Sequence, residues 1–128
     1  MAYDNEHRLV SKVVKDRNII PVLEQGIKDD WFVDDDLRRV WKFVRDHYVN
    51  YREVPTAVTV VDNFPNFKVL DVEDTIDYLI DTMVAFRRRT ITRNGIEIVV
   101  TKIDMNDHEA ALIEMSKTVS LVNEQGVI

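Results

Sequence analysis

Cysteine is absent from the 128-residue sequence, so the chain has neither a disulfide scaffold nor a thiolate metal site. Glycine and proline occur only three times each, which leaves few of the turn signals that separate β-strands. Long apolar runs are also missing, and no stretch approaches the roughly 18 residues of a membrane span. Residues 1–6 are polar and acidic and lack the features of a signal peptide. We therefore expect a helical, cytoplasmic protein that does not enter a membrane.

An excess of basic charge is lacking as well. The net charge is −6, from 17 Lys and Arg residues and 23 Asp and Glu residues. Residues 1–84 carry all of it, because residues 85–128 are neutral overall. Duplex-binding domains usually present a basic face, whereas this chain would be repelled by phosphate. We expect no direct DNA ligand.

Motifs for catalysis and for cofactor binding are absent too. No Gly-x-x-x-x-Gly-Lys-Ser/Thr sequence is present to cradle the phosphates of ATP. Metal-ligand spacing is not found among the histidines, which are His7, His47 and His108. No nucleophile elbow surrounds the serines, which are Ser11, Ser116 and Ser120. We predict a non-catalytic chain with no cofactor and no metal ion.

Two groups of residues admit both a functional and a structural interpretation. Asp34, Asp35 and Asp36 could bind calcium or magnesium, which favour clustered carboxylates, but the spacing of an EF-hand does not follow. Because the trio precedes a helical pattern, we expect a helix cap with acids that complement the helix dipole. The aromatic residues could stack on nucleic-acid bases. Their helical spacing favours a buried core instead, and they are Trp31, Phe32, Trp41, Tyr48, Phe64 and Phe67.

Apolar side chains recur at helical spacing along almost the whole chain, so we predict an all-α fold. Residues 1–84 should form a globular helical bundle, with Pro21 in a first turn and Gly26 as a left-handed stop. The expected helices cover residues 4–16, 18–25, 37–51 and 57–63, and a fifth begins at a capping box in residues 71–74. The β-branched run at residues 58–61 leaves a strand as the alternative there. The expected caps are Asp4 or Asn5, Asn18, the aspartate trio and Thr56.

The helical spacing of apolar side chains in residues 85–126 predicts a long antiparallel helical hairpin. Together with residues 1–84, this hairpin would form a single domain over residues 1–128. Its arms, residues 86–103 and 108–125, would each be about 27 Å long at a rise of 1.5 Å per residue. Asn106 has a glutamate three residues later, as in a capping box. Gly126 would end the second arm, and a break near Ala85 stays open. The second arm has heptad-like spacing of apolar residues, which predicts an inner seam that faces the first arm. Its members are Leu112, Met115, Val119 and Val122.

The first arm carries more apolar residues than one helix face can hold. They fall into two groups that point in different directions, and the second arm can cover only one of them. An exposed patch this apolar is unusual on a monomer. We therefore expect a two-fold dimer of hairpins; the alternative is a hairpin that folds back onto residues 1–84. The first group is Ile91, Ile98 and Val99, the second is Ile96, Val100 and Ile103, and the other arm adds Ile113 and Leu121 to the expected interface.

The basic cluster of the chain consists of Arg87, Arg88, Arg89 and Arg93. It could contact DNA or an acidic partner, or it could be a solvated helix face with ordinary ion pairs. Three consecutive arginines point in different directions on a helix and cannot serve one site together. We favour the solvated face, and expect any functional arginine among them to cross the dimer interface.

Several local patterns follow the order of elements in a known family. Residues 6–10 resemble an opening glutamate followed by a leucine pair, and residues 17–23 resemble a short second helix after a polar turn. Similar patterns lie at residues 31–35, 37–43, 54–56, 78–79 and 86–89. In these segments, which span nearly the whole chain, the sequence resembles the N-terminal collar domain of DnaB-type replicative helicases. It departs from the family at the glycine expected after the leucine pair and in the short, divergent region 57–67, which favours a remote member of the kind that a phage encodes.

The resemblance implies a role in assembly. Domains of this family dimerise through their hairpins, and three dimers form a collar above a hexameric, ATP-dependent helicase ring. The collar also offers a docking surface to primase or to a helicase loader, and DNA is contacted only through the parent helicase. Because the sequence ends at Ile128, where a linker to a RecA-like motor would begin, we expect a piece of a larger helicase in a bacterial or infected-host cytoplasm. The alternatives are a free-standing collar mimic that binds a host helicase or primase, and a small helical DNA-binding regulator.

Overall fold

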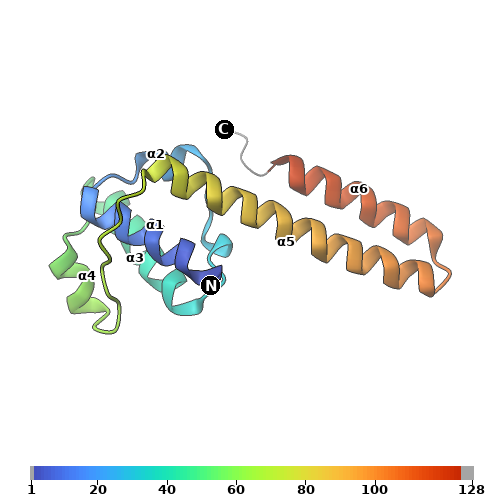
Figure 1. The fold of residues 1–128 in the computed structure, drawn as a ribbon, viewed down its shortest axis with the longest axis horizontal. Coiled ribbons are helices and arrows are strands. Elements are labelled where there is room, and N and C mark those ends of the chain that lie inside the picture. Colours follow the sequence, from blue (N-terminus) through green and yellow to red (C-terminus); the bar gives the residue numbers. More distant parts are fainter. Residues whose placement is uncertain (1, 125–128) are drawn as a thin grey trace. The chain divides into compact units, whose positions relative to one another are not determined.

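The computed structural model describes residues 2–124, which form six α-helices and one short 3-10 helix without any strand (Figure 1). The all-α prediction is therefore confirmed. The elements are α1 (Ala2–Asp16), α2 (Ile20–Glu24), η1 (Asp29–Trp31), α3 (Asp35–Tyr51), α4 (Ala57–Asn63), α5 (Ile76–Asp104) and α6 (His108–Glu124). The predicted helix end at Gln125 and the predicted stop at Gly126 lie outside the described residues.

The chain divides into two compact units, Met1–Met83 and Val84–Ile128. Helix α5 begins in the first unit and continues into the second without interruption, so the open question of a break near Ala85 is answered in favour of one helix. The division lies within a residue of the expected boundary between the globular part and the hairpin. A single domain that includes both units stays a prediction.

The core of the first unit is built where α1 and α3 pack together. The apolar pairs of α1 recur every four residues and are buried, among them Leu9 and Val13. On α3 the same spacing buries Val40 and Trp41, and the Phe32 ring stacks on Trp41 with 5.3 Å between the ring centroids. These aromatic residues therefore belong to the core, as their spacing predicts.

Local capping signals are confirmed in the middle of this unit. The side chain of Asp34 accepts a hydrogen bond from the backbone N–H of Leu37 at 3.0 Å at the start of α3. Thr56 caps α4 in the same way by accepting from the N–H of Thr59 at 3.2 Å. Gly26 has a φ of 75°, the left-handed conformation expected of a helix stop. The run at residues 58–61 is helical, so the strand alternative is wrong.

The first two helices begin at other residues than the sequence suggests. Helix α1 is already formed at Ala2, so neither Asp4 nor Asn5 caps it. The N-cap of α2 is Ile19, which makes no side-chain cap hydrogen bond, and not Asn18. Both errors shift a helix end by about two residues, the usual uncertainty of such boundaries.

The loop between α4 and α5 lies against α1, and this contact overrides the capping box expected at residues 71–74. Asp71 forms an ion pair with Lys15 at 2.8 Å, and Asp74 forms one with Arg8. The acids that would open a helix instead attach the loop to the basic residues of α1. The predicted start of α5 is therefore wrong by about one helical turn.

Helices α5 and α6 each begin at a capping residue that lies one or more residues later than the predicted cap. At the start of α5, Thr75 Oγ1 accepts a hydrogen bond from the N–H of Tyr78 at 3.2 Å. At the start of α6, Asp107 Oδ1 accepts from the N–H of Ala110 at 3.0 Å. Asn106, expected to be this cap, has a φ of 56° and supplies the left-handed turn between the arms instead.

Candidate self-association surface

Helices α5 and α6 of the second unit pack as an antiparallel hairpin around one very close approach (Figure 1). Gly95 is buried in the middle of α5, and it faces the side chain of Thr118 on α6. A Cβ atom added at Gly95 would lie under 3.0 Å from three atoms of that threonine. A side chain at position 95 would therefore force Thr118 or the helices to shift, which favours glycine at this point.

The seam continues along α6 at a second small residue. Ala111, one turn into the helix, is only 3% exposed, whereas Leu112 beside it is 65% exposed. The seam predicted for α6 is therefore wrong, because three of its four members point to solvent at the exposed positions Leu112, Met115 and Val119. The real seam is shifted by about one residue. Its partly buried positions on α6 include Glu114, Thr118, Leu121 and Val122.

The eight residues expected at the oligomer interface separate into two sets. Three lie half-buried along the seam between the arms: Ile91, Val99 and Leu121. The other five are exposed: Ile96, Ile98, Val100, Ile103 and Ile113. The hairpin therefore leaves most of the expected interface uncovered by its own second arm, although whether another copy covers it stays a prediction.

The exposed residues of α5 form a stripe beside the seam. This stripe consists of Ile96, Val100 and Ile103. Because each residue advances the helix by about 100°, the stripe is rotated about 100° around the axis of α5 from the seam residues, in the direction in which the helix turns. On α6 an equivalent stripe lies about 70–100° beyond its own seam in the same sense, and consists of Leu112, Met115 and Val119.

These two stripes lie on the same side of the hairpin. Viewed from one end of the hairpin, one antiparallel arm turns clockwise and the other anticlockwise. The same angle of rotation from the seam around each helix axis therefore brings both stripes to the same face. With Gly95 opposite Thr118, the residues of the two stripes alternate along the hairpin axis. We call this surface the hairpin apolar face; it comprises Ile96, Val100, Ile103, Leu112, Met115 and Val119.

The area left exposed on this face is large enough to favour association. Complete burial of a Val, Leu, Ile or Met side chain contributes about 1.5–3 kcal/mol. The exposed fractions on this face lie between 46% at Ile103 and 65% at Leu112, so about half of that contribution is still available. Two facing copies would gain roughly 9–18 kcal/mol if all six side chains of each copy were covered, against an association cost of about 4–15 kcal/mol. Stable association therefore requires most of the face to be covered.

Sequence reasoning missed the half of this face that α6 supplies. Heptad spacing made Leu112, Met115 and Val119 look like an internal seam. The signal that identifies the real seam is the spacing of small residues, with Gly95 on one arm and Ala111 and Thr118, seven residues apart, on the other. Small side chains at the closest interhelical contact allow close packing, while Leu112, Met115 and Val119 stay outside the seam.

The aspartate trio and His7 make structural contacts in the described residues. Asp34 is the cap of α3, while Asp35 and Asp36 pair with arginines one turn further along α3, so the cap interpretation is confirmed. His7 packs on Phe67 with 5.0 Å between ring centroids. Within residues 2–124 no group of His, Asp and Glu is arranged to hold a metal ion. The same residues include no helix that is both long and apolar enough to cross a membrane.

The arginine cluster lies at the start of the second unit, on α5. Arg88 and Arg89 are exposed and Arg87 is partly buried. A role for any of them at a dimer interface stays a prediction.

Comparison of the chain with protein-family models, with curated proteins and with solved structures gives no significant match. The resemblance to the collar domain of DnaB-type helicases therefore stays a hypothesis that depends on the sequence patterns and on the order of the helices.

Proposed function

We propose that this chain is a non-catalytic assembly domain, which forms dimers through the hairpin apolar face and belongs to the collar of a DnaB-type hexameric replicative helicase. One observation carries the association: the two arms meet closely where Gly95 faces Thr118, while six large apolar residues on one side remain exposed. A soluble monomer rarely keeps a contiguous apolar surface of this kind.

The collar assignment adds a geometry to this surface. A two-fold axis through the hairpin apolar face lets the same six residues meet their equivalents, as an isologous interface requires. Three such dimers would complete the hexameric collar. The docking of primase or of a helicase loader is supported by the family resemblance alone.

The mass of the protein in solution tests the association. We expect dimers or hexamers by light scattering coupled to size-exclusion chromatography. Val100→Glu places a charge in the centre of the hairpin apolar face, where association would bury it without a partner, so this variant should be monomeric. The matched control is Thr101→Glu, at the next exposed position, which points away from the face.

The two variants must be equally helical by circular dichroism for the comparison to count. A wild-type chain that remains monomeric at high concentration would refute the proposal. An equal loss of association in the two variants would place the interface elsewhere on the protein.

A further inference from the structure

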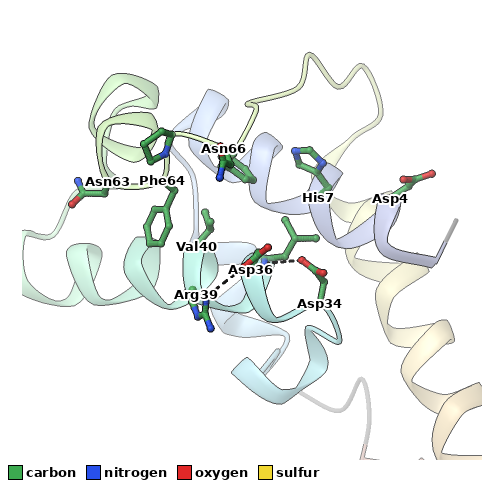
Figure 2. Close-up of a pocket in the computed structure, with 12 residues that line it drawn as sticks. Asp4, His7, Asp34, Asp36, Arg39, Val40, Asn63, Phe64 and Asn66 are labelled. Atoms are coloured by element: carbon green, nitrogen blue, oxygen red, sulfur yellow. Dashed lines mark hydrogen bonds and ion pairs between the residues drawn. The ribbon is translucent and has the colours of Figure 1, made fainter.

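The first unit contains a hollow that is lined by residues of this unit alone. It has a volume of about 470 Å³ and lies between the start of α1, the first turns of α3 and the loop after α4. Figure 2 shows the side chains that line it, with Phe64 extending from the loop toward α3 and Val40. Residues from three separate parts of the chain therefore form one concave surface, which we call the α3 groove.

The floor of the α3 groove is apolar. Leu37 and Val40 contribute from α3, and Phe64 and Phe67 contribute from the loop. The Phe64 ring contacts Phe43 of α3 edge-on, with 5.5 Å between the ring centroids. This contact holds Phe64 in the floor of the groove, so an apolar side chain of a ligand would meet a surface that is already formed.

The loop that follows Phe67 is held on α1 by hydrogen bonds. His7 Nε2 donates to the carbonyl oxygen of Lys68 at 2.6 Å, since a carbonyl oxygen can only accept. Ser11 Oγ accepts from the N–H of Leu70 at 3.0 Å. The loop beside the groove is thereby fixed on α1, and binding would require little ordering of the protein.

The rim of the α3 groove is acidic. The described residues that line it include three aspartates, Asp4, Asp34 and Asp36, and one arginine, Arg39. The pair between Asp36 and Arg39 is long, at 3.4 Å, and its side chains are 88% and 71% exposed, so it contributes little. The carboxylate of Asp36 can therefore exchange this contact for a cation of a ligand.

We propose that the α3 groove binds a short segment of a partner protein that carries lysine or arginine beside one or two large apolar residues. The apolar floor receives the apolar side chains, and the acidic rim pairs with the basic ones. Charge complementarity extends beyond the groove, because residues 1–84 carry the whole net charge of −6. The inference rests on the first unit alone and does not depend on self-association through the hairpin.

Fluorescence anisotropy with labelled hexapeptides and the full chain tests this inference. The probe is Lys-Leu-Phe-Lys-Leu-Arg. One control peptide, Glu-Leu-Phe-Glu-Leu-Glu, keeps the apolar residues and reverses the charge; the other, Lys-Ser-Gly-Lys-Ser-Arg, keeps the charge and removes the apolar residues. We expect saturable binding of the first peptide alone. Equal binding of either control would overturn the proposal, as would the absence of saturable binding by the first peptide.

Two variants with opposite expected effects test the position of the site. Asp36→Asn should weaken binding by about twofold to fivefold, and Arg39→Gln, which removes a weakly competing cation, should strengthen it by up to about twofold. The matched control is Asp35→Asn, which removes the same charge one residue away, from a side chain that does not line the groove.

Equal effects of Asp35→Asn and Asp36→Asn would show a diffuse charge effect and overturn the proposed site. The Val100→Glu variant should bind the probe as tightly as the wild-type chain does. Failure of peptide binding and failure of self-association are therefore separate outcomes.

Discussion

Replacement of Gly95 by alanine is the most direct test of the way in which the hairpin is packed. In an ordinary exposed helix, glycine is less favourable than alanine by about 0.8–1 kcal/mol, so the substitution would stabilise the protein. In this hairpin the added methyl group would lie under 3.0 Å from three atoms of the Thr118 side chain, one of them the Cβ atom. Thr118 is short and β-branched, so it has few ways to move aside.

The expected magnitude follows from these opposing effects. Forced overpacking of a close contact costs typically about 1–3 kcal/mol. After the gain in helix propensity is subtracted, Gly95→Ala should lower the free energy of unfolding by up to about 2 kcal/mol. The sign is therefore opposite to the one that helix propensity alone predicts.

Urea denaturation followed by circular dichroism measures this effect, at one fixed protein concentration because association contributes to stability. The matched control is Asn94→Ala, at the neighbouring exposed position, which should be neutral or slightly stabilising. The double variant Gly95→Ala/Thr118→Ala should recover part of the loss, with a coupling of about 1 kcal/mol.

A Gly95→Ala protein that is about 1 kcal/mol more stable than the wild-type chain would refute the reasoning. That result would mean that the arms do not meet at Gly95, and the assignment of the hairpin apolar face would fail with it.

Two further predictions concern buried polar groups of the first unit. Ser11→Ala removes the hydroxyl that accepts a hydrogen bond from the Leu70 N–H, so it should lower the free energy of unfolding by about 1–2 kcal/mol in urea denaturation. The control Ser120→Ala, at an exposed position, should have little effect. Burial raises the pKa of Glu6 above its usual value, and hydrogen bonding to the N–H of Val33 offsets this only in part. The folded state therefore holds this proton more tightly than the unfolded state, so the contribution of Glu6 is most favourable below its ordinary pKa and declines as the pH rises through the folded-state pKa. Glu6→Gln should remove that decline when urea midpoints are compared across this pH range, and an unchanged decline would contradict the assignment.

Local sequence signals predicted the parts of the fold in which neighbouring residues decide the structure. The caps at Asp34 and Thr56 and the left-handed Gly26 depend on hydrogen bonds and backbone angles within a few residues. The bounds of α4, Ala57–Asn63, agree with the prediction for the same reason. The periodicity of α1 and α3 predicted their buried faces because one stripe of each helix is apolar.

Local sequence signals failed to predict the structure where a residue distant in the sequence competes for the same side chain. The acids at residues 71–74 have the spacing of a capping box, but Lys15 and Arg8 of α1 pair with two of them. A sequence pattern cannot show which of two favourable partners an acid will meet. The start of α5 was decided by that tertiary contact.

By itself, the sequence determined an all-α protein, its main helices and an excess of apolar side chains on the C-terminal hairpin, because each of these follows from local spacing and composition. Only the tertiary structure decided which apolar side chains are covered. The close approach of Gly95 to Thr118 sets which faces of the two arms meet, and it leaves six large apolar residues on one exposed side. The α3 groove likewise exists only after folding, because its walls come from three segments that the loop contacts with α1 bring together.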